Sequence, residues 1–189
     1  EKFDPDVIVL ASNTPSLLFR EKLPKNIITI LPPLEKIQKP GNVAILTTEI
    51  VIKSKELENY ISEFNGLKEV LTINCSELVE LVESGKFLTH ERDCVKTILK
   101  VLKDEFKENK INIATLSSTH LPFLLPFLKK YFRGVEFLDP AEDVAIKISK
   151  LEKSKSTRNS LSIYTTKSQK ALQRNLKSMG ISNKVNLFS

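Results

Sequence analysis

Two polar turns, far apart in the sequence, carry the residue types most suited to chemistry. Residues 7–10 form a short apolar run that is followed by Ser12, and residues 111–116 form a second run that is followed by Ser118 and His120. Such runs are typical of buried parallel strands, and polar groups at the carboxyl ends of these strands lie where open α/β sheets bind small anions. The pattern predicts a strand, a polar turn and a helix start at each place.

Helix capping is the simpler explanation for either turn alone. Ser, Thr and Asn are favoured N-cap residues, and a proline such as Pro15 or Pro122 is favoured at the start of a helix. Two such turns in one chain strengthen the alternative, because the two strand ends could face each other across one cleft. Their hydroxyl, amide and backbone N–H donors would suit a carboxylate.

Composition and charge limit the class of protein. The chain has 189 residues, of which 41% are hydrophobic, as expected for a globular protein with a buried core. No apolar run approaches the roughly 18 residues of a membrane helix, and the first residues do not resemble a signal peptide, so we predict a cytoplasmic protein without a membrane span.

The net charge of +6 permits nucleic-acid contact, but the lysines are dispersed without a binding motif, so nucleic acid is a minor alternative. Abundant Lys, Glu and Ile with five Gly lean weakly towards a thermophile.

Neither cysteine has the spacing of a metal or disulfide framework. Cys75 and Cys94 stand apart, without a Cys-x-x-Cys or Cys/His pattern, so we expect both to be small buried residues. We therefore predict neither a metal site nor a disulfide.

Hydrophobic periodicity predicts alternating strands and helices. Strands are expected at 7–10, 26–31, 42–47, 68–74, 111–116, 135–138, 161–165 and 185–187. Helices are expected at 17–22, 54–64, 77–84, 89–109, 144–151 and 167–179, with a further helix beginning after His120. A turn at 39–42 marks the crossing into another subdomain, and 153–160 is expected to be a mobile loop. The alternation predicts an α/β fold with mainly parallel sheets flanked by helices.

Quoted in full, the two turns resemble the catalytic loops of the aspartate/glutamate racemase superfamily, most closely those of glutamate racemase. The family's Ala-Cys-Asn-Thr-Ala-Ser stands here as Ala-Ser-Asn-Thr-Pro-Ser at 11–16, and its Gly-Cys-Thr-His-Tyr-Pro stands as Ser-Ser-Thr-His-Leu-Pro at 117–122. Four further landmarks follow the family's order, at 44–54, 75–85, 138–145 and 164–166. The resemblance covers nearly the whole chain.

The resemblance implies two pseudo-symmetric lobes with the substrate in the cleft between them. Residues 1–38 with 121–189 would form the first, discontinuous lobe, and residues 39–120 the second. The family's opening segment has no counterpart here, so we expect the first lobe to lack its N-terminal strands. Its sheet edge would then be exposed and invite association, so either the chain is part of a longer protein or a homodimer or another partner covers that edge.

The family racemises without a cofactor, using two cysteines on opposite faces of the Cα atom. Ser12 and Ser118 stand at these catalytic positions. With the pKa of water standing in for that of an alcohol, the thiol-to-alcohol gap is roughly 7 pKa units, on the order of 10 kcal/mol. An adjacent base recovers part of such a gap in serine hydrolases, and His120 is the nearby candidate, although we favour an orienting or capping role for it. The resemblance assigns amino-acid binding to Asn13, Thr14, Thr48 and Thr119 and places Glu83 as an acidic residue of the cleft.

Two readings of the function follow. In the first, the protein is a pseudoenzyme that has lost the two-thiol mechanism and either binds a small amino acid or dicarboxylate or serves a structural role. In the second, it is an active racemase or isomerase, either because the serines are engineered replacements made to trap substrate or because Ser with His120 runs another isomerase or lyase reaction. Departures from the family pattern at Val51, Ser117 and Leu121 favour natural divergence.

Overall fold

The computed structural model describes residues 3, 5–24, 26–38, 41–64, 70–151 and 160–188. The chain divides into two compact units, residues 1–151 and residues 152–189. The strands of the first unit are β1 (Ile8–Leu10), β2 (Ile27–Thr29), β3 (Val43–Thr47), β4 (Val70–Asn74), β5 (Ile113–Leu116) and β6 (Glu136–Leu138). Its helices are α1 (Asn13–Leu18), η1 (Leu34–Lys36), α2 (Glu49–Ile52), α3 (Lys55–Ser62), α4 (Ser76–Glu83), α5 (Lys86–Thr89), α6 (Glu91–Glu108), η2 (Leu121–Leu124), α7 (Leu125–Tyr131) and α8 (Ala141–Leu151).

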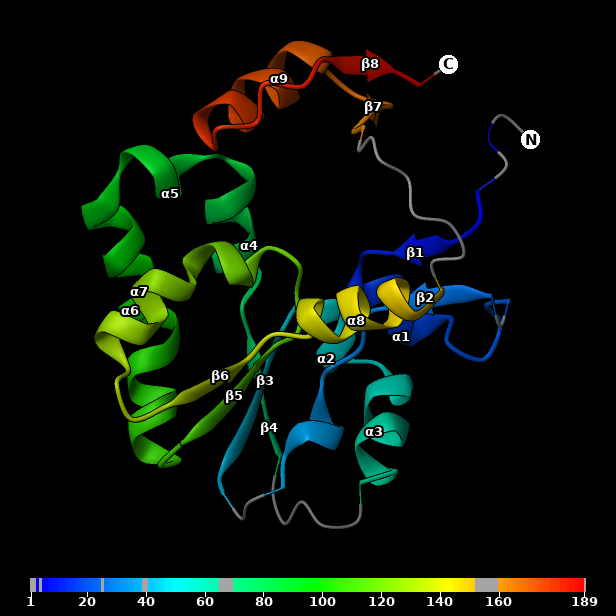
Figure 1. The fold of residues 1–189 in the computed structure, drawn as a ribbon. Coiled ribbons are helices and arrows are strands. Elements are labelled where there is room, and N and C mark those ends of the chain that lie inside the picture. Colours follow the sequence, from blue (N-terminus) through cyan, green and yellow to red (C-terminus); the bar gives the residue numbers. More distant parts are fainter. Residues whose placement is uncertain are drawn as a thin grey trace. The chain divides into compact units, whose positions relative to one another are not determined.

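A four-stranded parallel sheet forms the centre of the first unit (Figure 1). Its strand order is β4-β3-β5-β6, and every residue of β3 and β5 is buried. Residues of β3 pair with β5 from Val43 opposite Ile113 to Leu46 opposite Leu116. Because all strands are parallel, their carboxyl ends lie along one edge of the sheet.

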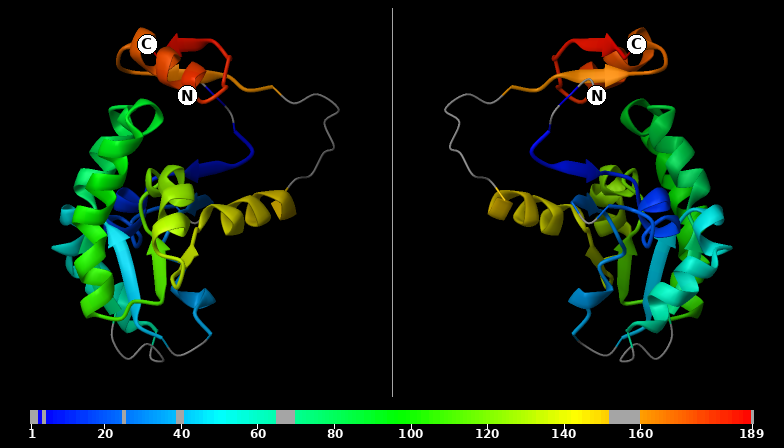
Figure 2. Two further views of the ribbon diagram at one scale, coloured as in Figure 1. Left: turned by 90° about the vertical axis from the view of Figure 1, so that its left-hand side faces the viewer. Right: turned by 90° about the vertical axis from the view of Figure 1, so that its right-hand side faces the viewer.

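Helices cover both faces of this sheet, because alternate residues of a strand point to opposite sides. Ala44, Leu46 and Leu116 pack on one face with the apolar residues of α4, α6 and α7. Ile45 and Ile113 pack on the other face with residues of α1, η1 and α3. Figures 1 and 2 show α6 running beside the strands. The apolar side of each helix thus packs against one face of the sheet and forms the core on that face with the strand residues.

A separate parallel pair, β1 and β2, carries the first polar turn. The hydroxyl of Ser16 in α1 donates to the carbonyl of Leu10 at 3.2 Å and accepts from the backbone N–H of Ile30 at 3.2 Å. Ser16 is fully buried, so this hydroxyl joins the ends of both strands to the helix. The pair is less covered than the central sheet, and Ile8 remains 43% exposed.

The second unit contains a small β-α-β arrangement within residues 160–188. Strand β7 (Ile163–Thr165) pairs in parallel with β8 (Val185–Leu187), and helix α9 (Gln169–Ser178) connects them. The side-chain amide of Gln173 holds the segment before β8 against the helix, donating to the carbonyl of Asn183 and accepting from the N–H of Val185.

The structure confirms the α/β fold with parallel sheets flanked by helices. One predicted helix, at 17–22, was wrong in its limits, because α1 spans Asn13–Leu18. Pro15 lies in the first turn of α1, where backbone N–H groups have no intrahelical partner, so it does not delay the helix.

The division into lobes at residues 38 and 120 stays a prediction, and residue 39 lies outside the described ranges. Strand β6, beyond residue 120, belongs to the same sheet as β3, β4 and β5. The predicted loop at 153–160 also falls outside the described residues except for Ser160. Within those residues, no helix has the length and apolarity needed to cross a membrane.

Candidate functional site

The turns that follow β3, β4 and β5 lie at the carboxyl edge of the central sheet. The backbone N–H of Cys75 donates to the carbonyl of Thr47 at 2.7 Å, and that of Ser117 donates to the carbonyl of Leu46 at 3.0 Å. These bonds continue the strand pairing beyond β3, β4 and β5. Leu46 lies opposite Leu116, so Thr48, which follows β3, and Ser118, which follows β5, belong to turns at the same edge of the sheet.

A chain of contacts links Ser118 to a carboxylate. The hydroxyl oxygen of Ser118 lies 3.4 Å from Nδ1 of His120, and Nε2 of His120 lies 3.3 Å from Oε1 of Glu83. Ser118 is only 7% exposed, whereas the side chain of Glu83 is largely exposed at the end of α4. The hydroxyl of Ser118 also accepts weakly from the backbone N–H of His120 at 3.4 Å. Sequence reasoning named all three residues but favoured an orienting or capping role for His120.

Two of the predicted site residues have buried side-chain polar atoms without a hydrogen-bond partner among the described residues. Both amide atoms of Asn13 are unpaired, and Asn13 is 5% exposed. The hydroxyl of Thr48, the residue before α2, is likewise buried and unpaired. Helix α1, which begins at Asn13, packs against α2. A buried polar group without a partner costs about 1–3 kcal/mol, so each such group needs an explanation, and a bound ligand is one.

The remaining predicted residues are less connected. Ser12 is the N-cap of α1, but its side chain makes no capping hydrogen bond. Within the described part of the chain, no hydrogen bond or ion pair joins Ser12, Thr14 or Thr119 to another predicted site residue. The roles predicted for these three residues stay predictions.

Both cysteines are buried and unpaired, as the sequence predicted. Burial raises the pKa of Cys75 to about 12. Burial, with the nearby charge of Glu91, raises the pKa of Cys94 as well. Neither thiol is therefore ionised at neutral pH.

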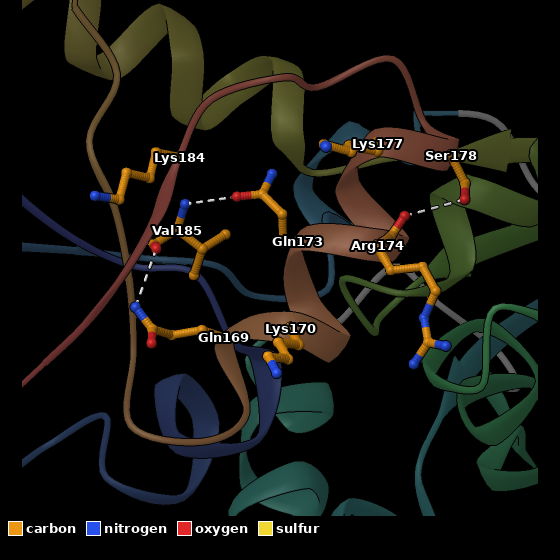
Figure 3. A pocket seen from close by; sticks show the side chains of 8 residues that line it. All are labelled: Gln169, Lys170, Gln173, Arg174, Lys177, Ser178, Lys184 and Val185. Atoms are coloured by element: carbon orange, nitrogen blue, oxygen red, sulfur yellow. Dashed lines mark hydrogen bonds between the residues drawn. The ribbon is translucent and has the colours of Figure 1, made fainter.

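No cluster of three or more His, Cys, Asp or Glu side chains suited to a metal ion occurs among the residues that the structure describes. A cavity of about 710 Å³ lies in the second unit (Figure 3). It is lined by Gln169, Lys170, Gln173, Arg174, Lys177, Ser178, Lys184 and Val185. None of the predicted site residues lines this basic cavity, so it is separate from the candidate site.

No family model matches the chain. A glutamate racemase from Carboxydothermus hydrogenoformans is 27% identical over 181 residues, which cover 91% of this chain and 67% of that protein. The structure of a glutamate racemase isoform from Bacillus anthracis superposes with a TM-score of 0.82 at 22% identity, covering 100% of this chain and 75% of that one. This chain is similar to glutamate racemases in sequence and in fold.

A second solved homologue is the Escherichia coli glutamate racemase, with a TM-score of 0.79, 20% identity and coverage of 100% of this chain and 76% of that one. The chain spans about half to two thirds of the length of the first curated relatives that it matches. The comparisons therefore show the fold and a sequence similarity to glutamate racemases.

Two features of the site were missed from the sequence. The contact between His120 and Glu83 joins residues 37 positions apart, and only tertiary packing brings them together. The buried hydroxyl of Ser16, which fixes the first turn, was read as part of a motif without a structural role. The available signal was the position of Ser16 four residues after Ser12, on a short helix that follows the strand.

Proposed function

We propose that this chain is a glutamate-racemase-like protein that binds a small amino acid or dicarboxylate between its predicted lobes and does not run two-cysteine racemisation. Ser12 and Ser118 occupy the positions of the family's two cysteines in this proposal. Asn13, Thr14, Thr48 and Thr119 then contact the ligand.

The observation that carries this proposal is the pair of buried, unpaired polar groups on Asn13 and Thr48. An amide offers two donors and an acceptor, and a hydroxyl offers one donor and two acceptor lone pairs. These groups match the carboxylate and amino groups of an amino acid. The Escherichia coli homologue was solved with L-glutamate bound, which supports an amino-acid ligand here.

The chemistry of the serines supports the loss of racemisation. Removal of a Cα proton needs a base on one face and an acid on the other, and an alcohol without an activating base is too weak an acid to be ionised at neutral pH. The pKa gap of roughly 7 units relative to a thiol corresponds to a barrier increase on the order of 10 kcal/mol. Only the turn of Ser118 has a histidine in contact, so the first turn lacks an equivalent base within the described residues.

Isotope exchange tests the proposal directly. The protein is incubated at high concentration with L- or D-glutamate, and separately with aspartate, in deuterated water. We expect no deuterium at Cα by mass spectrometry, together with saturable binding of one of these ligands by calorimetry. Exchange above the protein-free control contradicts the loss of racemisation, and absence of binding contradicts the ligand assignment.

An active racemase or isomerase is the second candidate, favoured by the 3.4 Å contact between Ser118 and His120. The double change Ser12→Cys with Ser118→Cys separates the two. Racemisation gained by this variant would mean that only the thiols were missing. No gain would mean that the surrounding site has diverged as well, as the residues at Val51 and Leu121 indicate.

A further inference from the structure

The contacts of His120 favour one of its ring nitrogens as the base. The carboxylate of Glu83 can only accept a hydrogen bond, so its oxygen 3.3 Å from Nε2 favours a proton on that nitrogen. In that tautomer Nδ1 carries the free lone pair, and it is the nitrogen that lies 3.4 Å from the hydroxyl of Ser118. The hydroxyl then donates to His120, and the carboxylate at the end of α4 lies against the far side of the ring.

This arrangement has the parts of an activated nucleophile. A hydroxyl, a base within reach and a carboxylate that fixes the base are the recurring elements of nucleophilic serine sites, whichever fold holds them. The contact at 3.4 Å is at the outer limit of a hydrogen bond, and such contacts commonly tighten when substrate binds. Ser118 lies at the carboxyl end of β5, with His120 partly open to solvent.

An unpaired donor lies at the same edge of the sheet as the nucleophile. Thr48 follows β3, which pairs with β5, and the hydroxyl of Thr48 is buried without a hydrogen-bond partner among the described residues. An unpaired buried donor is available for the oxygen of a tetrahedral intermediate without breaking an existing bond.

We propose that Ser118 is a nucleophile for acyl transfer, with His120 as its general base and Glu83 as the positioning residue that orients His120. The substrate class is an ester or thioester of a small amino acid or dicarboxylate, and this class rests on the proposed function. Ligand binding and serine reactivity are separate properties of the site, so one can fail while the other holds.

The reaction balances without a redox partner. The hydroxyl of Ser118 attacks the acyl carbon, its proton moves to Nδ1 of His120, and an acyl–oxygen bond forms. The bond from carbon to the alcohol or thiol breaks, and the leaving group takes the proton from Nδ1. Water then attacks the acyl-serine, gives its proton to Nδ1, and the serine oxygen leaves with that proton to restore the free hydroxyl.

A fluorophosphonate reagent on the full chain provides the test, because it forms an oxygen–phosphorus bond with an activated serine and releases fluoride. We expect a single label on Ser118, mapped by peptide mass spectrometry. Ser118→Ala removes the label, and His120→Gln slows labelling about a hundredfold, the usual effect of losing a general base. No label on Ser118, or an unchanged rate in a folded His120→Gln variant, overturns the proposal.

The chain offers a matched control for the histidine. His90 also contacts a hydroxyl, since its Nδ1 lies 2.7 Å from Oγ1 of Thr89, but it has no carboxylate contact among the described residues. His90→Gln should therefore leave the labelling of Ser118 unchanged. If His120→Gln fails to fold, His120→Gly provides a second variant, and added imidazole should restore its labelling. A folded His120→Gly variant without rescue by imidazole counts against general-base catalysis.

Glu83 needs a readout that a structural role would not change. We expect Glu83→Gln to lower the labelling rate about tenfold and to alter the ring ¹⁵N shifts of His120, which report the tautomer. Glu80→Gln, an exposed glutamate on the same helix, should change neither. Unaltered ¹⁵N shifts in Glu83→Gln remove Glu83 from the proposal.

Protection experiments distinguish this inference from the proposed function. Glutamate or aspartate at saturating concentration should slow the labelling of Ser118 if the two share one site. Labelling without protection leaves the nucleophile in place and removes the amino-acid ligand. Binding without labelling keeps the amino-acid ligand and removes Ser118 as the nucleophile.

Discussion

The two polar turns share their sequence pattern, but the structure equips them differently. At the first turn, the Ser12 side chain makes no capping bond, and its neighbour Asn13 has a buried amide without partners in the described ranges. At the second, Ser118 contacts His120, which in turn contacts Glu83. The first turn therefore has unpaired groups suited to binding, and the second has a chain of groups suited to proton transfer.

This difference bears on the class of reaction. Racemisation requires two acid–base groups on opposite faces of one carbon, and the family loops quoted above likewise carry a histidine in the second turn only. Acyl transfer requires one activated nucleophile and a set of binding groups, which the second and the first turn would supply in the proposal above.

The largest effect should come from single cysteines placed in the two turns. We expect Ser118→Cys to react with iodoacetamide at neutral pH about a hundredfold faster than Ser12→Cys, because an adjacent histidine stabilises a thiolate. The native thiols provide a low background, since burial raises the pKa of both Cys75 and Cys94. Mass spectrometry of the alkylated peptides measures both rates. Equal rates would show that the two turns are chemically alike.

A smaller effect should follow from removing the hydroxyl that fixes the first turn. Ser16→Ala leaves the carbonyl of Leu10 and the N–H of Ile30 without this partner, so we expect a loss of about 2 kcal/mol in the free energy of unfolding. Urea denaturation measures it. The matched control is Ser62→Ala, whose exposed hydroxyl donates to the carbonyl of Asn59 and whose loss should change stability little.

The same variant, Ser16→Ala, tests whether the two polar turns act independently. If they are independent, Ser16→Ala should weaken amino-acid binding while the labelling rate of Ser118 stays unchanged. A parallel fall in both would mean that the turns are coupled through the sheet.

The smallest effect concerns Thr48, the N-cap residue of α2. Thr48→Val replaces a buried, unpaired hydroxyl with a methyl group of similar size, so we expect the free protein to gain up to about 1 kcal/mol of stability and to lose ligand affinity. Thermal unfolding and calorimetry measure the two changes. The control is Thr97→Val, which removes an exposed hydroxyl on α6. It should change neither the stability of the free protein nor its affinity for the ligand. Destabilisation by Thr48→Val would mean that the hydroxyl has a partner in solution.

The sequence predicted the regular elements well because their signals are local. The stripe of Cys94, Ile98, Leu102 and Phe106 repeats at helical spacing, and α6 buries those four residues. The apolar runs before the two turns became β1 and β5 for the same reason. The homology to glutamate racemases rests on motifs that also lie in continuous stretches of sequence.

Contacts between distant residues were not predictable in the same way. Nothing in the residues around Glu83 specifies that its carboxylate reaches Nε2 of His120, because that contact depends on how α4 packs beside the turn after β5. The limits of α1 were wrong because the polar residues from Asn13 to Ser16 read as a turn, although they form the first turn of the helix. Which polar groups lack partners likewise depends on the burial of each atom.

The pairing of β3 with β5 means that the site is located by residues that take no part in its chemistry. A slip of two residues would keep every apolar side chain on its own face, yet would shift the turn after β3 by about 6.6 Å relative to the turn after β5. The buried strands thus determine where the side chains of the site lie, whereas the residues of the turns determine which side chains they are. The residues of the turns can therefore change while the paired strands keep the positions of the site.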